Sequence, residues 1–300
     1  NGASGIPVLC FGGGTLDSAA IPTDLSKIIV FNNIFDKLFV KYINVKSENE
    51  FDLIDNTWPE IEAQKVHNLM KGSVYDTIQA AIADAADGDT ILIASGTYVV
   101  NQTIQTDKEL TIIGNGTEKT IIDVSSVPDN AWGVLINKSN STIKDLTIKS
   151  EKTQKYNNNL KISDEGSAPI GKLTGISIIN VSLEGGKGLD VYKSSVKLDN
   201  VKVSNSLGAS IAISNGSNVE ISNTTTENGA WGSLGVMYKD GYAKSSVSIL
   251  DGNNFEEGLL YEEGYKNQES NQITGLANWE SFVNERDQLI WVRELPKGAY

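Results

Sequence analysis

A six-residue pattern recurs along this chain and constrains its fold more than any other feature. Each copy reads apolar, any residue, Asn or Asp, apolar, any residue, apolar, with Thr in the fourth position of one copy. The copies begin at Ile143, Ile178, Leu198, Ile221 and, in a shortened form, Ile249. Their Asn or Asp positions are 35, 20, 23 and 28 residues apart. Self-similarity at roughly 20 to 30 residues indicates a solenoid, in which each repeat forms one rung.

The Asn or Asp position of the pattern predicts a side-chain ladder. Strands of neighbouring rungs stack about 4.8 Å apart, so amides at the same turn can bond to each other. We therefore expect Asn180, Asn200 and Asn223 to stack at one corner, with Val181 and Val201 pointing into the coil. The longest gap between copies holds the polar stretch 151–171, which we expect to be a loop leaving one rung.

An amphipathic helix is predicted just before the first strands. Asp76 is suited to its N-cap, with Gln79 three residues later as in a capping box. The apolar stripe of this helix consists of Ile78, Ala81, Ile82, Ala85 and Ala86. Gly88 is expected to end it, because glycine takes the left-handed conformation without a Cβ penalty. Short strands follow, separated by glycine-rich turns.

This order resembles the entry to the right-handed parallel β-helices of the pectin lyase-like group. The matching segments are 77–82, 88–91, 96–98 and 110–114, which read TIQAAI, GDTI, GTY and LTIIG. The resemblance implies a helix that covers the open N-terminal end of the coil. It implies no single activity, because the group contains lyases, hydrolases, esterases, epimerases and proteins without catalysis.

The expected fold is all-β: one right-handed parallel β-helix with an N-terminal capping helix. We assign residues 74–255 to the β-helix, 256–300 to its C-terminal cap, and 1–73 to an N-terminal extension. The extension either ends a preceding module or folds back beside the coil. Within it, residues 60–70 could form a short helix, with Pro59 before them.

Charge excludes two classes of partner. The formal net charge is -13 and the isoelectric point is near 4.6, whereas nucleic acid and anionic lipid both require clustered Lys and Arg. No apolar run approaches the roughly 20 residues that span a bilayer. We therefore expect neither nucleic-acid binding nor membrane insertion.

The catalytic motifs that the resemblance would imply are missing. Pectate lyases of this fold act through a strand-borne Arg beside calcium ligands, but Arg286 and Arg293 both follow the repeats. Polygalacturonases carry an aspartate trio and Gly-His-Gly, whereas the single histidine, His67, lies outside the repeats and is interpreted as a surface helix residue. The Leu-Gly-Arg-Pro-Trp segment of pectin methylesterases is also missing.

One catalytic alternative stays open, because a β-helix lyase can use a Lys base beside a calcium-bound uronate. Such a lysine needs a lowered pKa so that its neutral amine can accept the proton. The candidates are Lys193, Lys197 and Lys202, near Asp190, Asp199 or Glu184. The simpler interpretation is that these are outward polar residues. Since Asp84, Asp87 and Asp89 lack the spacing of a calcium loop, no cofactor is predicted.

Aromatic residues give the positive functional signal. Residues 130–136 (NAWGVLI) parallel residues 229–235 (GAWGSLG), so one Ala-Trp-Gly triplet is expected to open the same strand on two rungs. Aromatic rings on a flat face can stack on the C–H faces of sugars. The predicted carbohydrate-binding residues are Trp132, Trp231, Tyr192, Tyr238 and Tyr242. The alternative is that each Trp fills a corner of the coil.

These observations favour a non-catalytic polysaccharide-binding or adhesion protein that is extracellular or on a bacterial cell surface. The expected partner is a polysaccharide, with plant cell wall glycans as the leading class. In type, though in no residue motif, the chain is similar to the tāpirins, which are cellulose-attaching surface β-helix proteins of plant-degrading bacteria. The alternatives are a calcium-dependent lyase with a Lys base and a structural spacer of a surface protein.

Overall fold

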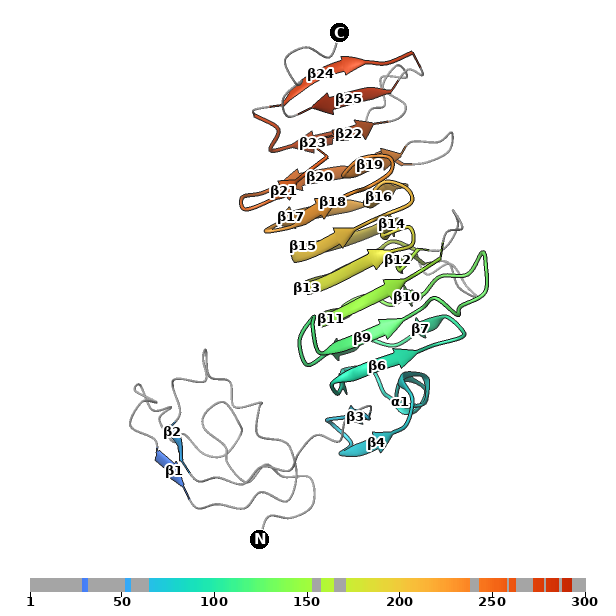
Figure 1. Ribbon diagram of the computed structural model, residues 1–300, viewed down its shortest axis with the longest axis vertical. Helices are drawn as coiled ribbons and strands as arrows, with labels where there is room; N and C mark the ends of the chain where they lie inside the picture. The colour runs from blue at the N-terminus through green and yellow to red at the C-terminus, as the bar shows by residue number, and fades with distance from the viewer. Residues whose placement is uncertain are drawn as a thin grey trace. The chain divides into compact units, whose positions relative to one another are not determined.

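A computed structural model describes residues 29–31, 52–54, 65–152, 158–164, 171–237, 243–257, 259–262, 272–277, 279–285 and 288–292. The chain divides into two units, 1–63 with 71–73 and 64–70 with 74–300. In the first unit, β1 (Ile29–Phe31) pairs in parallel with β2 (Asp52–Ile54). The second unit carries the repeats, and its strands stack rung upon rung (Figure 1). It is a right-handed parallel β-helix, which confirms the solenoid that the repeat predicts and the fold that the resemblance implies.

Two sheets form the walls of the coil. The 14-stranded sheet contains β3 (Val66–Asn68), β4 (Ser73–Tyr75), β5 (Asp89–Ile93), β6 (Gly96–Val99), β8 (Leu110–Ile113), β9 (Thr120–Asp123), β11 (Thr142–Ser150), β13 (Leu173–Gly185), β15 (Ser194–Ser204), β17 (Asn218–Ser222), β18 (Thr225–Glu227), β20 (Ser246–Ile249), β21 (Asn254–Phe255) and β23 (Gln272–Thr274). The 9-stranded sheet contains β7 (Ile104–Thr106), β10 (Val134–Ile136), β12 (Leu160–Ile162), β14 (Leu189–Tyr192), β16 (Ile211–Ser214), β19 (Leu234–Met237), β22 (Leu259–Glu262), β24 (Glu280–Val283) and β25 (Leu289–Val292).

The register of the 14-stranded sheet confirms the alignment of the repeats. The first residues of the five copies pair in one row: Ile143, Ile178, Leu198, Ile221 and Ile249. The first four of these side chains are almost fully buried and join one core cluster along the coil. Because successive side chains of a strand point to opposite faces, the alternating pattern places one row inside the coil and one outside.

The predicted Asx corner is confirmed, with one shift along the ladder. Asp145, Asn180, Asn200 and Asn223 all have φ between 49° and 59°, a left-handed conformation that Asn and Asp tolerate well. The amide of Asn180 donates to Asp145 at 2.8 Å, and the amide of Asn200 donates to Asn180 at 3.0 Å. Asn223 donates instead to Asp199, the residue before Asn200, at 2.7 Å.

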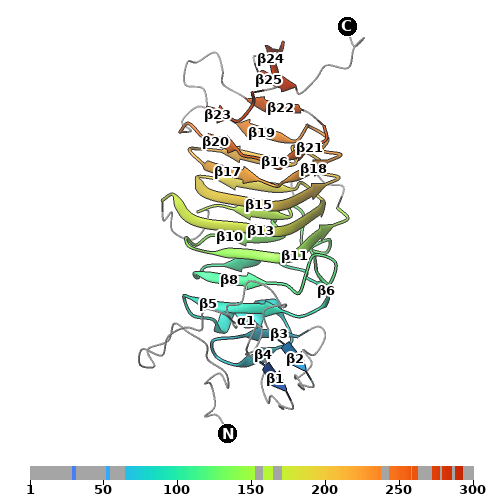
Figure 2. The same ribbon diagram turned by 90° about the vertical axis from the view of Figure 1, so that its left-hand side faces the viewer.

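Helix α1 (Ile78–Asp84) begins one residue later than the sequence predicts. Thr77 is the N-cap, and its side-chain oxygen accepts a hydrogen bond from the Ala80 N–H at 3.1 Å. The expectation of Asp76 as N-cap is wrong, since its carboxylate is paired with Lys65 at 2.7 Å. The predicted apolar stripe is buried at Ile78, Ala81, Ile82 and Ala85, and Figure 2 shows α1 beside β5 at the end of the coil.

The C-cap of the helix is Ala85, three residues before Gly88, so the predicted end at Gly88 is wrong. Ala86, the last residue of the predicted apolar stripe, lies beyond the helix and is exposed. Tertiary contacts explain the early stop. The ammonium of Lys108 donates to the carbonyls of Ile82 and Ala83 at 2.9 and 2.8 Å, which satisfies last-turn carbonyls from outside the helix.

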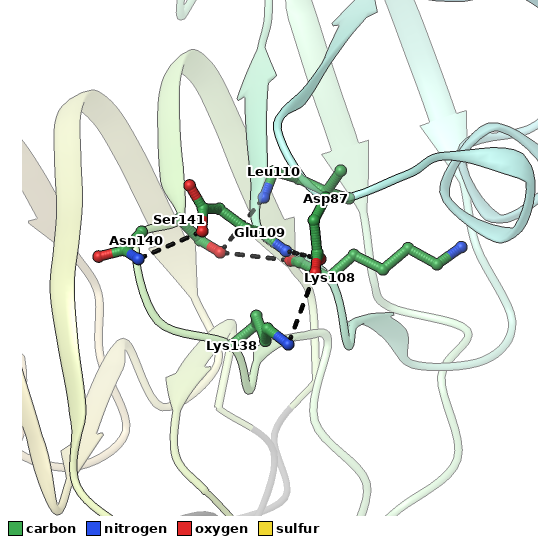
Figure 3. A network of polar contacts seen from close by, with 7 residues as sticks. All are labelled: Asp87, Lys108, Glu109, Leu110, Lys138, Asn140 and Ser141. Carbon is green, nitrogen blue, oxygen red and sulfur yellow. Dashed lines mark hydrogen bonds and ion pairs between the residues drawn. The ribbon is translucent and has the colours of Figure 1, made fainter.

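A polar network beyond the helix fastens the following turn to the first rungs (Figure 3). The carboxylate of Asp87 accepts the Glu109 N–H at 2.8 Å and lies 3.8 Å from the Lys138 ammonium. Asp89 accepts hydrogen bonds from Asn68 and Ala86 at 2.6 and 2.9 Å. Asp87 therefore lies in the predicted turn after the helix, whereas Asp89 is the first residue of β5.

Antiparallel strands lie at both ends of the coil. At the first end, β3 pairs antiparallel with β5, and β3 includes His67. The interpretation of His67 as a helix residue is therefore wrong, as is the helix predicted over 60–70 where it overlaps β3. At the other end, β22 pairs antiparallel with β25, and β25 with β24.

Within the described residues, no helix is both long and apolar enough to cross a membrane.

Candidate functional site: the outer face of the 9-stranded sheet

Strand β12 carries a lysine on the outer face of the 9-stranded sheet. Leu160 and Ile162 are fully buried in the core, so Lys161 between them points away from it. The sheet register places Lys161 beside Leu135 of β10 and Asp190 of β14. The polar composition of residues 151–171 predicts a loop over this region. That expectation is wrong for residues 160–162, and the alternation of Leu160, Lys161 and Ile162 was the signal for a strand.

The Lys161 ammonium lies between two aromatic rings. It is 5.0 Å from the ring centroid of Trp132 and 5.5 Å from that of Tyr192, within the range of cation–π attraction. Its Nζ atom is also 3.4 Å from a carboxylate oxygen of Asp190. Lys161 itself is only 8% exposed, whereas Trp132 and Tyr192 are partly exposed. The structure thus brings together two of the five predicted carbohydrate-binding residues around a lysine that is not in the predicted set.

A second ion pair crosses the same two strands. The Lys193 ammonium, just after β14, lies 3.0 Å from the carboxylate of Asp164, just after β12, and the Asp164 side chain is 5% exposed. The four charged groups of the two pairs sum to zero. Nearby, Oδ1 of Asn137 is buried and accepts no hydrogen bond within the described part of the chain. We call Trp132, Lys161, Tyr192 and Asp190 the aromatic–lysine cluster.

Trp231 lies on a later rung than Trp132. The register runs from Val134 through Leu160, Leu189 and Ile211 to Leu234, which is four strand spacings, or about 19 Å. Trp132 precedes Val134 by two residues, but Trp231 precedes Leu234 by three. Relative to the strands that follow them, the two Ala-Trp-Gly triplets are therefore offset by one residue. The prediction that they occupy equivalent positions on their rungs is wrong by this one residue.

Exposure also separates the two indoles. The Trp231 side chain is 46% exposed, whereas Trp132 is more buried and packs beside Lys161. The Lys187 ammonium lies 5.9 Å from the Trp231 ring centroid. Tyr238 and Tyr242, the remaining predicted binding residues, lie outside the described residues.

The loop that carries Trp231 is held by Glu257. Its carboxylate accepts hydrogen bonds from the Gly229 N–H and the Ser233 hydroxyl, both at 2.5 Å, and from the Thr226 hydroxyl at 2.8 Å. Burial of this carboxylate tends to raise its pKa. The hydrogen bonds from Ser233, Gly229 and Thr226 outweigh burial and hold the pKa of Glu257 below its ordinary value.

The lysines considered as a catalytic base are all paired with carboxylates. Lys193 pairs with Asp164, Lys197 with Glu220 at 3.5 Å, and Lys202 with Glu227 at 2.7 Å. The hydrogen bond from Lys202 to Glu227 raises the pKa of Lys202, which is opposite to what a neutral amine base needs. Among the described residues, no three His, Cys, Asp or Glu side chains gather as a metal site.

A lysine outside the predicted set has the pKa shift that a base needs. Burial lowers the pKa of Lys172, whose ammonium donates to the Gly216 carbonyl at 2.6 Å. No carboxylate or aromatic ring is found beside it in the described part of the chain, and no sequence pattern indicates it. This lysine therefore forms a contact between turns of two rungs rather than part of a recognisable site.

A groove of about 590 Å³ lies on the outer face of the 14-stranded sheet. Small polar side chains line it on four successive strands, and the exposed Lys197–Glu220 pair crosses it. Its lining residues are Gly175, Ile176, Ser177, Ser195, Val196, Lys197, Asn218, Val219, Glu220, Ser246 and Ser248. It contains no aromatic ring, so the aromatic–lysine cluster is the better candidate for holding a sugar.

Comparison with known proteins places the chain in a family. The family model described as rhamnogalacturonase A/epimerase, pectate lyase-like, matches residues 72–239, which is more than half of the chain. No curated protein matches. Among solved structures, a pectin methylesterase from Erwinia chrysanthemi aligns at 14% identity with a TM-score of 0.41, covering 74% of this chain and 82% of its own. A pectin methylesterase from Yersinia enterocolitica aligns at 13% identity with a TM-score of 0.34, covering 72% and 86%. The family match covers helix α1 and the rungs that carry the aromatic–lysine cluster. Because it extends over more than half of the chain, this protein belongs to the rhamnogalacturonase A/epimerase, pectate lyase-like family.

Proposed function

We propose that this protein is a non-catalytic polysaccharide-binding protein of a bacterial surface, and that the outer face of β10, β12 and β14 holds the glycan. The observation that carries the proposal is the Lys161 ammonium placed between the partly exposed rings of Trp132 and Tyr192. A ring fixed by such a neighbour loses little conformational freedom when a ligand binds, so more of its contact energy contributes to affinity.

The chemistry of the cluster fits a sugar. Aromatic faces contact the C–H faces of a pyranose, while the carboxylate of Asp190, whose side chain is 23% exposed, can accept hydrogen bonds from its hydroxyl groups. The two ion pairs contribute no net charge to this face, so they provide no excess of cations for a polyuronate. Membership of a family named after pectin-active enzymes supports a plant cell wall glycan as the ligand class.

The lyase alternative has less support. Lys193 and Lys197 are each paired with a carboxylate, and the hydrogen bond from Lys202 to Glu227 raises the pKa of Lys202, which disfavours the neutral amine that would take a proton. Incubation with pectin and calcium distinguishes the two functions. The ultraviolet absorbance of an unsaturated uronate should not increase, whereas a time-dependent increase that Lys193→Ala abolishes would establish the lyase.

A pull-down tests the binding proposal. The protein is mixed with insoluble cellulose, xylan, pectin or chitin, and the bound fraction is compared with that of Tyr192→Ala. We expect at least one polysaccharide to retain the protein and Tyr192→Ala to reduce retention several-fold. The matched control is Lys197→Ala, which removes an exposed ion pair on the other sheet and should not change retention. Retention by none of the four would favour the structural spacer, whereas retention that Tyr192→Ala leaves unchanged would reject this face as the glycan site.

A further inference from the structure

Trp231 occupies an unusual position, an exposed indole on a short loop rather than on a strand. The loop comprises residues 229–233 and leads directly into β19. It lies against the preceding rung, where the Ala230 N–H donates to the Ser206 carbonyl at 2.8 Å and the Trp231 N–H donates to the Gly208 carbonyl at 3.1 Å. One side of the ring faces Gly208, and the side chain remains 46% exposed.

Glu257 reaches this loop from the following rung and holds both of its ends. Oxygen Oε1 accepts the N–H of Gly229, where the loop begins, and Oε2 accepts the hydroxyl of Ser233, where it ends. Oε2 also accepts the hydroxyl of Thr226, which lies in β18 and is fully buried. The carboxylate thus ties the loop to a rigid strand, and Trp231 lies midway between the two tied residues.

The fit around this contact is tight. A Cβ atom at Gly229 would lie 2.5 Å from Oγ of Ser210 and 3.2 Å from Oε1 of Glu257, so only glycine allows the approach. Ser210 and Ser233 are fully buried, which keeps water from replacing the carboxylate. Three hydrogen bonds to one charged acceptor are stronger than the same bonds to a neutral one.

We infer that Glu257 is the positioning residue for Trp231, and that through this indole it extends the glycan-binding face along the coil. The inference rests on the proposed polysaccharide binding. The rungs of Trp132 and Trp231 are four strand spacings apart, about 19 Å along the coil, although Tyr192 of the cluster lies on β14, two spacings from β19. Only an extended oligosaccharide or polysaccharide reaches both, so an indole held in place at the far end selects long glycans over short ones.

The test combines a binding measurement with a measurement on the indole itself. Glu257→Ala removes all three hydrogen bonds, and Ser233→Ala removes one and serves as the milder variant if the first unfolds. Glu256→Ala is the matched control, since it removes the same charge from the neighbouring, exposed residue. Retention is measured on insoluble cellulose, xylan, pectin and chitin. Each protein is also made with Trp231→Phe, and the fluorescence of this partner is subtracted. The remaining signal comes from Trp231, and its quenching by acrylamide is measured.

We expect Glu257→Ala to weaken retention as much as Trp231→Ala, several-fold, and to increase quenching of the Trp231 signal. The double variant should lose no more than either single one, because both changes act on the same indole. Glu256→Ala should match the unaltered protein. Unchanged quenching in both Glu257→Ala and Ser233→Ala, or additive losses in the double variant, would overturn the positioning role. Increased quenching without any effect of Trp231→Ala on retention would keep the positioning role and reject glycan binding at Trp231.

Discussion

The side-chain amide of Asn200 donates a hydrogen bond of 3.0 Å to the side-chain carbonyl of Asn180 on the preceding rung. Both residues have left-handed backbone, with φ of 52° and 51°, at the turn where β15 and β13 bend. One residue type therefore meets two demands. It tolerates the turn conformation, and it supplies a donor and an acceptor along the stack.

Replacement of Asn200 should separate these two demands. Asn200→Leu loses the amide bond and forces a γ-branched side chain into the left-handed region, so we expect a loss of about 1–3 kcal/mol in the free energy of unfolding. Asn200→Gly loses the bond but accepts the conformation, and should cost less. The urea midpoints of the two variants measure the difference, and equal midpoints would show that backbone strain is negligible at this turn.

Helix α1 should protect the first rung from association. Ile78 is 1% exposed, so Ile78→Asp places a charge between the helix and the coil and should release the helix. The first strands would then present an open edge, and soluble protein should be lost to aggregates in size-exclusion chromatography. Ala80→Asp adds the same charge on the exposed side of the helix and should remain soluble. A monomeric Ile78→Asp protein would mean that another segment caps the coil.

The two tryptophans should differ in their effect on stability. Trp132 is more buried and contacts Lys161, so Trp132→Ala should lower the free energy of unfolding by up to about 3 kcal/mol. Trp231 is 46% exposed, and Trp231→Ala should leave the melting temperature nearly unchanged. Calorimetry on both variants checks this. A large decrease for Trp231→Ala would favour the alternative that the indole fills a corner of the coil.

The Lys161–Asp190 pair should contribute more than the Lys197–Glu220 pair. Lys161→Met leaves the Asp190 carboxylate, whose side chain is 23% exposed, without its nearest cation. Removing one partner of a fully buried pair costs roughly 3–5 kcal/mol, and we expect a loss approaching the lower end of that range. Lys197→Met breaks a pair with side chains that are 73% and 53% exposed and should cost no more than about 1 kcal/mol. Equal urea midpoints for the two variants would contradict this ranking.

Acid should weaken the contact made by Glu257. Its folded-state pKa lies below the ordinary value of 4.5, so the contribution to stability is present above that value and is lost as pH falls through the folded-state pKa. The urea midpoint of Glu257→Gln should therefore be lower than that of the unaltered protein at pH 7. The two midpoints should converge when the pH falls well below 4.5. If the difference between the two midpoints does not shrink at any acidic pH at which the protein is still folded, the charge is not what stabilises the loop.

The repeat and the ladder followed from the sequence because both depend on local periodicity. Alternation of apolar residues decides which side chains enter the coil, and Asn or Asp at a fixed place in each copy marks the turn. The alignment of the repeat copies consequently agrees with the strand register. It places the first residues of the copies, from Ile143 to Ile249, in one row, and it stacks the side chains of Asp145, Asn180 and Asn200. Strand β12 was missed because only three of its residues show the pattern, within a polar stretch.

The sequence by itself determined that this chain coils into rungs, since burial of alternating apolar side chains and stacking of turn amides act between segments with the same local pattern. Only the tertiary structure decided where Lys161 meets Trp132, Tyr192 and Asp190, how Glu257 reaches the loop of Trp231, and that Thr77 rather than Asp76 caps the helix. Those contacts join residues from different rungs or depend on a competing ion pair. Their geometry is set by the number of residues in each turn, which varies from rung to rung and leaves no periodic trace in the sequence.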